Sequence, residues 1–216
     1  GIMGVSVTIP HKLSVMEHLD VVEKRALEIG AVNTIVRHGD NLVGHNTDWQ
    51  GAVAALLQKT DLKGRAVTVV GAGGAARAVG FGVLSQGGEV TIVNRSAARG
   101  ERLAADLGVD FCPLPEMDRI QSQVLVNTTP VGMFPNAGVM PVHEKQLKRG
   151  MVVMDIVYNP LETALLKAAR EKGCITIDGV SMFVHQGAAQ FRLWTGRSAP
   201  LELMQSVVYE KLGEFR

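Results

Sequence analysis

The stretch Val67-Thr68-Val69-Val70-Gly71-Ala72-Gly73-Gly74-Ala75-Ala76 decides the fold of this chain. Its first four residues are all β-branched, which is typical of a strand buried on both faces of a parallel sheet. The glycines follow where this strand must turn sharply into a helix, expected over about 75–86. Gly71 permits the tight turn, Gly73 allows a pyrophosphate to approach the backbone, and Ala76 permits close packing of helix on strand. The unpaired N–H groups at the start of such a helix favour bound phosphate.

The next strand indicates which nucleotide the chain prefers. Gly87-Gly88 ends the helix, and a second buried strand over 89–93 runs into Asn94-Arg95-Ser96. An acidic residue at this point binds the ribose 2′-hydroxyl of NAD, whereas an arginine accommodates a 2′-phosphate. Here Asn94 is followed by Arg95 and Arg99, which favours NADP over NAD. The alternative is that both arginines are ordinary solvated surface residues.

Strands and helices alternate from residue 65 to 180, which predicts an α/β fold built on a doubly wound parallel sheet of the Rossmann type. Further strands are expected at 110–112, 123–127, 151–156 and 175–177, and further helices at 97–107, 163–172, 182–195 and 200–211. The earlier part of the chain predicts strands at 5–9, 31–36 and 42–46 and helices at 13–19, 21–29 and 49–59. We therefore expect a partial substrate domain over 1–48, with a C-terminal helix at 199–216 packed back on it, and an NADP-binding domain over 49–198.

Composition excludes several classes of partner. The 22 Lys and Arg residues balance 21 Asp and Glu residues, so no basic excess suggests a nucleic acid or an anionic membrane. No apolar run is long enough to span a membrane, and no signal peptide is visible. Cys112 and Cys174 are expected to be reduced thiols of a cytoplasmic protein. No Cys/His cluster has the spacing of zinc ligands, so no metal is expected.

Polar residues stand at the ends of several apolar strands, and two of them suggest catalysis. Lys12 follows the strand expected at 5–9, and Asp48 opens the helix expected at 49–59. When hydride reaches a carbonyl carbon, the oxygen must receive a proton, which a lysine beside a carboxylate can supply. Taken alone, Lys12 could equally be a surface lysine. Asp48, or Thr47 before it, could equally be a helix N-cap.

Several motifs together resemble the shikimate dehydrogenase family, in the family's order and over essentially the whole chain. They comprise residues 6–12 (SVTIPHK), 30–34 (GAVNT), 44–51 (GHNTDWQG), the glycine loop, Asn94-Arg95, 127–133 (NTTPVGM) and 186–188 (QGA). The resemblance implies reversible reduction of 3-dehydroshikimate to shikimate with NADPH, in aromatic amino-acid biosynthesis.

The same resemblance assigns roles residue by residue. Lys12 matches the catalytic lysine and Asp48 its partner aspartate. Substrate-binding roles fall to Ser6, Thr8, Asn33, Tyr158 and Gln186. Pyrophosphate contacts fall to Gly71, Ala72, Gly73, Gly74 and Ala75, and the adenosine phosphate pocket to Asn94, Arg95 and Arg99. The nicotinamide end of NADP is expected near Thr128, Val157, Gly179 and Met182.

Two departures from the family pattern qualify this resemblance. Ser6 stands where many bacterial members carry Asn, whereas the plant-like members fused to a dehydroquinate dehydratase also have Ser. The family's N-terminal stretch, with a serine pair that grips the substrate carboxylate, is absent from this sequence. We therefore expect an unpaired edge strand with exposed apolar side chains. We also expect a chain that binds NADP(H) but turns over poorly, as a monomer or homodimer.

Two other functions remain open at this point. A quinate or quinate/shikimate dehydrogenase would share the fold, although NAD-preferring members tend to carry an acidic residue where Asn94 stands. A shikimate-sensing regulatory domain would keep the fold without catalysis, although a sensor has no need for both Lys12 and Asp48.

Overall fold

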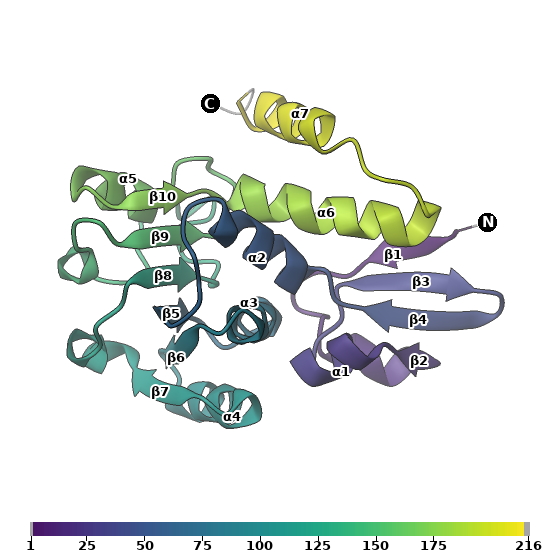
Figure 1. Ribbon diagram of the computed structural model, residues 1–216, viewed down its shortest axis with the longest axis horizontal. Helices are drawn as coiled ribbons and strands as arrows, with labels where there is room; N and C mark the ends of the chain where they lie inside the picture. The colour runs from purple at the N-terminus through teal and green to yellow at the C-terminus, as the bar shows by residue number, and fades with distance from the viewer. Residues whose placement is uncertain (1, 214–216) are drawn as a thin grey trace.

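The structure, a computed structural model, describes residues 2–213 and contains two sheets joined by helices (Figure 1). A six-stranded parallel sheet has the order β10-β9-β8-β5-β6-β7, and a four-stranded sheet has the order β1-β3-β4-β2. In Figure 1 the helices α2 (Asp48–Leu57) and α6 (Gly179–Thr195) lie between the two sheets.

The parallel sheet is the doubly wound fold that the sequence predicts. Its strands are β5 (Ala66–Val70), β6 (Glu89–Asn94), β7 (Asp110–Pro113), β8 (Val124–Asn127), β9 (Val152–Asp155) and β10 (Ile175–Ile177). Helices α3 (Gly74–Ser85), α4 (Ala97–Leu107) and α5 (Ala164–Glu171) connect them, with short 3-10 helices at Leu114–Arg119 and Glu144–Gln146. The strand order reverses between β5 and β8, which is where ligands bind in open α/β sheets.

Both faces of this sheet are buried, as the apolar strands require. On one face, Val67, Val69 and Val126 pack with apolar residues of α2, α3, α4 and α6. On the other, Leu125 and Val153 pack against α5 and the 3-10 segments.

The smaller sheet is built from β1 (Gly4–Ser6), β2 (Val21–Val22), β3 (Thr34–His38) and β4 (Asn41–His45). Strands β3 and β4 form the expected hairpin, and β1 pairs antiparallel with β3. Strand β1 lies at the edge of the sheet, and the side chains of Ile2, Met3 and Val5 are exposed there, as expected.

Three expected elements of this segment need correction. The strand expected at 5–9 ends at Ser6, because the chain turns shortly after it. The His11 N–H donates to the Thr8 carbonyl at 2.9 Å, and turn residues continue to Leu13. The helix expected at 13–19 is a 3-10 helix, Ser14–His18. The helix expected at 21–29 is the short strand β2 followed by α1 (Lys24–Ile29), because Val21 and Val22 pair with β4.

The C-terminal helix α7 (Leu201–Gly213) lies along α6, and not on the first 48 residues as expected. The Tyr209 hydroxyl donates a hydrogen bond of 2.8 Å to Asp178, the N-cap of α6, which brings the end of α7 beside the parallel sheet. Burial and the hydrogen bond to Asp178 raise the pKa of Tyr209 to about 12, so this hydroxyl keeps its proton. Among residues 2–213, no helix is both long enough and apolar enough to cross a bilayer.

Candidate functional site

Lys12 and Asp48, which are 36 positions apart in the chain, form an ion pair between the two sheets. Lys12 Nζ lies 2.7 Å from Asp48 Oδ2, and the Asp48 side chain is only 6% exposed. Lys12 also lies over the start of α3, because a Cβ built on Gly74 would be 3.1 Å from Lys12 Cβ. The Lys12 side chain therefore packs against the glycine loop that joins β5 to α3.

Asn33 holds the second oxygen of the aspartate. Its Nδ2 donates to Asp48 Oδ1 at 2.8 Å, to Thr47 Oγ1 at 2.9 Å and to Gln186 Oε1 at 3.3 Å. Its Oδ1 accepts from the Thr47 backbone N–H at 2.8 Å and from Thr34 Oγ1 at 2.7 Å. A buried carboxylate is tolerated when it is paired and hydrogen-bonded in this way.

The N-cap position of α2 is one of the two expected, but the side-chain hydrogen bond at this helix start comes from another residue. Thr47 occupies the N-cap position, but its side chain makes no cap hydrogen bond and bonds with Asn33 instead. Asn46 takes over, since its Oδ1 accepts from the Asp48 N–H at 3.0 Å while its Nδ2 donates to the Ala31 carbonyl at 2.8 Å. Asn46 and Thr47 are thus site residues to which the sequence had assigned no role in the site. Both residues follow β4 directly and contact Asn33 or Asp48 through the hydrogen bonds above.

The expected substrate-binding residues do not all gather at the pair. Gln186 does, through Asn33, and its Nε2 donates to the Phe183 carbonyl at 2.9 Å. Tyr158 stacks on Phe183 with ring centroids 4.7 Å apart and remains 40% exposed. Thr8 is exposed in the turn after β1. The Ser6 hydroxyl donates to Gln190 Oε1 at 2.9 Å, away from the Lys12–Asp48 pair in the hydrogen-bond network.

The glycine loop has the geometry that its residues predict. Gly71 has φ +124°, a conformation that favours glycine, and a Cβ there would lie 2.4 Å from Thr128 Oγ1. Gly73 is exposed, and a Cβ on it would have no atom within 4 Å. Gly73 is also the N-cap of α3. Because it has no side chain, the first N–H groups of this helix receive no hydrogen bond from a capping side chain. Ala72 and Ala75 flank this loop and are half-buried.

The two arginines after β6 are exposed. Neither Arg95 nor Arg99 forms an ion pair or a side-chain hydrogen bond within residues 2–213. Asn94 Nδ2 donates to the Ser96 carbonyl at 2.9 Å, which shapes the turn that carries them.

The residues expected near nicotinamide lie at the carboxyl ends of β8 and β9 and at the start of α6. Thr128 Oγ1 donates to the Val70 carbonyl at 2.6 Å and so joins the ends of β5 and β8. A Cβ on Gly179 would lie 2.6 Å from the Val157 carbonyl, so α6 starts directly against the 156–157 backbone. The Met182 side chain belongs to the apolar core between sheet and helices, and its backbone carbonyl packs against Gly51 of α2.

A buried carboxyl that the sequence did not single out braces this edge. Asp155 is fully buried and accepts from Asn127 Nδ2 at 2.8 Å, Thr163 Oγ1 at 2.7 Å and the Val157 N–H at 3.1 Å. Burial raises the pKa of Asp155 to about 6, against the three hydrogen bonds that favour its charged form. The sequence carries a faint signal for it, since Asp155 closes an apolar strand.

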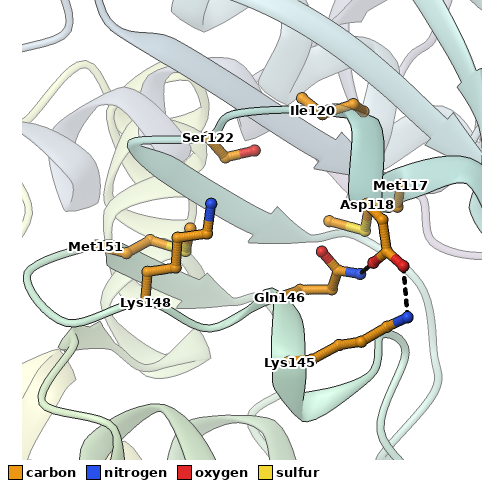
Figure 2. Close-up of a pocket in the computed structure, with 8 residues that line it drawn as sticks. All are labelled: Met117, Asp118, Ile120, Ser122, Lys145, Gln146, Lys148 and Met151. Carbon is orange, nitrogen blue, oxygen red and sulfur yellow. Dashed lines mark hydrogen bonds and ion pairs between the residues drawn. The ribbon is translucent and has the colours of Figure 1, made fainter.

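Figure 2 draws a pocket elsewhere in the molecule. Its walls include Ser122, just before β8, and Met151, just before β9, so it opens at the amino ends of these strands. Inside it, Asp118 accepts from Lys145 and Gln146. The pocket is therefore at the edge opposite the glycine loop. Within residues 2–213, no three His, Cys, Asp or Glu side chains gather as metal ligands would.

Comparison with known families covers most of the chain. Residues 1–35 match the family model described as the shikimate dehydrogenase substrate binding domain. Residues 53–178 match shikimate / quinate 5-dehydrogenase, and residues 179–209 match the shikimate 5'-dehydrogenase C-terminal domain.

Individual relatives agree with these matches. A shikimate dehydrogenase (NADP(+)) of Bacillus subtilis is 41% identical over 222 residues, which cover 99% of this chain and 79% of the relative. A crystal structure of a shikimate dehydrogenase in complex with NADP+ superposes with a TM-score of 0.92 at 40% identity, over 98% of this chain and 77% of that one. The enzyme of Thermus thermophilus, in complex with NADP(H) and shikimate, gives 0.89 at 37% identity, over 97% and 79%. These relatives are named for one activity, so they give no support to the expected likeness to the plant-like bifunctional type.

Proposed function

This chain belongs to the shikimate dehydrogenase family, and we propose that it catalyses the reversible reduction of 3-dehydroshikimate to shikimate with NADPH. By the same family resemblance, the reaction is a step of aromatic amino-acid biosynthesis. The observation that carries the proposal is the 2.7 Å ion pair of Lys12 and Asp48, seated over the start of α3.

The chemistry follows from the charge that develops during reduction. When bound, NADPH supplies the hydride that reaches the carbonyl carbon. The carbonyl oxygen then becomes an alkoxide, to which Lys12 Nζ gives a proton. Asp48, held by Asn33, keeps the Lys12 ammonium oriented for the transfer. In the oxidative direction Lys12 takes the proton back.

Donors and acceptors beside the pair suit a ring that carries several hydroxyl groups. We assign the substrate contacts to Thr8, Asn33, Tyr158 and Gln186, with Asn33 and Gln186 supported by their position next to Asp48.

The residues of the second lobe fit NADP. Gly71 to Ala75 leave the backbone open for a pyrophosphate at the start of α3, and Arg95 and Arg99 are free to bind a 2′-phosphate on the turn that Asn94 shapes. We assign the nicotinamide end to the edge that Thr128, Val157, Gly179 and Met182 occupy at the carboxyl ends of β8 and β9 and the start of α6.

A quinate-oxidising activity is the second candidate, because the matched family model is itself described by both substrates. Initial rates with shikimate and with quinate, each with NADP+ and with NAD+, separate the two. We expect shikimate with NADP+ to give the highest kcat/KM. A higher value with quinate and NAD+ would reverse the assignment. A purely sensory role is disfavoured because Lys12 and Asp48 are both present and paired.

Three further properties are proposed on narrower grounds. We assign the chain to the single-activity type of its relatives. A cytoplasmic location is supported by the free thiols of Cys112 and Cys174, whose pKa values are raised by burial so that both remain protonated. The expected monomer or homodimer and the division into lobes at residues 48 and 49 remain predictions.

Replacing the lysine tests the proposal directly. Lys12→Ala removes the proton donor and should lower kcat at least ~100-fold, the usual worth of a positioned general acid. The dissociation constant of NADPH, followed by its fluorescence, should change little. If Lys12→Ala kept its turnover, the proposed mechanism would be wrong, and an equal loss of NADPH binding would make Lys12 a structural residue.

A further inference from the structure

Gln190 lies on α6 one turn beyond Gln186 and is almost completely buried, since its exposed fraction is only 5%. Its Nε2 donates to Thr34 Oγ1 at 3.0 Å and to the Asn33 backbone carbonyl at 3.2 Å. Its Oε1 accepts from the Ser6 hydroxyl at 2.9 Å. A backbone carbonyl can only accept, so the nitrogen of the Gln190 amide must face β3 and its oxygen must face Ser6.

The direction of these hydrogen bonds continues to the catalytic pair. Because Gln190 donates to the Thr34 hydroxyl, the hydroxyl proton is free to be donated to Asn33 Oδ1, 2.7 Å away. The Thr47 backbone N–H, which can only donate, points at the same oxygen at 2.8 Å. With its oxygen held by two donors, Asn33 must turn its Nδ2 toward Asp48 Oδ1.

We propose that Gln190 is a positioning residue for the Lys12–Asp48 pair, acting through Thr34 and Asn33. In this arrangement Ser6 orients the Gln190 amide and does not bind substrate. The inference rests on the proposed function, because it assumes that Lys12 and Asp48 perform the proton transfer.

The test compares kcat, the KM for shikimate and the dissociation constant of NADPH in Gln190→Leu, in Thr34→Val and in the double variant. A misplaced catalytic group costs about tenfold to hundredfold in rate, so each single variant should lose at least about tenfold in kcat. NADPH affinity should not change, because the contacts of Gln190 are with Ser6, Asn33 and Thr34 and not with the glycine loop. Since Gln190 acts through Thr34, the double variant should be no slower than the slower single variant.

Two further substitutions sharpen the result. Thr34→Ser keeps the hydroxyl and should retain kcat. If Gln190→Leu does not fold, the comparison of kcat between Thr34→Ser and Thr34→Val tests the proposal in its place. Ser6→Ala should leave the KM for shikimate unchanged and lower kcat less than Gln190→Leu does. Gln86→Leu, an exposed glutamine at the end of α3, is the matched control and should behave as the parent.

Several outcomes would overturn the inference. A kcat of Gln190→Leu within twofold of the parent would do so, as would losses that multiply in the double variant. A raised KM for shikimate in Ser6→Ala would return Ser6 to the substrate contacts. Retained turnover in Lys12→Ala would instead defeat the proposed function itself, so the two failures are distinguishable.

Discussion

Lys12 and Asp48 carry opposite charges at different depths, with side-chain exposures of 19% and 6%. Asp48 is the more deeply buried of the two, and it accordingly has the larger set of hydrogen-bond partners. Asn33 donates to one oxygen of the Asp48 carboxylate and Lys12 to the other. These two hydrogen bonds fix the orientation of the carboxylate, which in turn positions the Lys12 ammonium. Lys12 is the more exposed of the two, so it is the member of the pair that a ligand bound beside the glycine loop can reach.

Arg95 tests nucleotide preference at the level of one side chain. A guanidinium bonded to phosphate contributes roughly 1.5–3 kcal/mol, so Arg95→Ala should weaken NADPH binding about 10- to 150-fold. Binding of NADH, which has no 2′-phosphate, should change little. Fluorescence titrations with both nucleotides measure this, and equal weakening of both would mean that Arg95 serves the fold or the whole adenosine.

Some residue roles could be predicted from the sequence and others could not. Lys12 and Asp48 follow from their positions at strand and helix ends and from the motifs around them. The contact of Gln190 with Thr34 joins residues 156 positions apart, so no local pattern contains it. For the same reason the sequence could not tell that the Ser6 hydroxyl faces Gln190.

At the level of elements, the turn from β5 to α3 separates two uses of glycine. Gly71 needs its positive φ and the space beside Thr128, so it serves the fold. Gly73 has φ −100° and open space around it, so the fold itself does not require a glycine there.

Gly73→Ala should therefore fold normally and bind the nucleotide poorly. We expect a free energy of unfolding within about 1 kcal/mol of the parent and NADPH binding weaker by tenfold or more, because the methyl group occupies the space of the pyrophosphate. Urea unfolding and fluorescence titration measure the two effects. Gly213→Ala, also in open space, is the control. Unchanged NADPH binding in Gly73→Ala would place the pyrophosphate elsewhere.

Asp155 ties β8, β9 and α5 together, and its ionisation should affect stability. Its folded pKa of about 6 lies above the ordinary 3.8, so the folded protein binds more protons than the unfolded chain between these values. The free energy of unfolding should consequently fall as pH rises from about 4 to about 6, by an amount on the order of 3 kcal/mol from this group.

Asp155→Asn removes the titration and should flatten this fall. Urea midpoints measured from pH 4 to pH 7 compare the variant with the parent and with Asp40→Asn, a fully exposed control. The Asn oxygen can keep the bonds from Asn127 and Val157, and its nitrogen can donate to the Thr163 hydroxyl, so the variant should still fold. Identical slopes in parent and Asp155→Asn would show that Asp155 is not the titrating group.

The elements of the parallel sheet can be predicted to within a few residues because most of their strands are continuous apolar runs that stop at a polar residue or a glycine. Residues 21–29 resemble one helix in the sequence because Val21-Val22 is too short to reveal strand periodicity. The start of α6 at Gly179 differs from the expected one by three residues. Asp178, a good N-cap whose side chain accepts from the Ser181 N–H, is the signal for that start.

At the level of the whole molecule, α2 and α6 pack closely against each other at Gly51. A Cβ on Gly51 would lie 2.7 Å from the Met182 carbonyl and 2.9 Å from Gln186 Cβ. Since α2 begins with Asp48 and α6 carries Gln186, the spacing of these helices sets the spacing of the site.

Gly51→Ala should push the two helices apart. Overpacking of this kind costs about 1–3 kcal/mol, and we expect a loss of stability in that range together with a lower kcat. Gly187→Ala on α6, whose Cβ would meet only the end of the Met204 side chain at 3.4 Å, is the matched control and should be neutral or slightly stabilising. Thermal unfolding and initial rates measure both variants. A Gly51→Ala protein as stable and as fast as the parent would mean that the contact is not restrictive.

The same helix α6 also donates from Trp194 Nε1 to the Ile35 carbonyl of β3, at 3.0 Å. The small sheet, formed by residues 4–45, is thus held by a side chain that lies 159 positions beyond Ile35 in the sequence. A chimaera joined by a single crossover between these two residues would take Ile35 and Trp194 from different relatives. Recombination within this family should therefore succeed best when β3 and α6 come from the same parent.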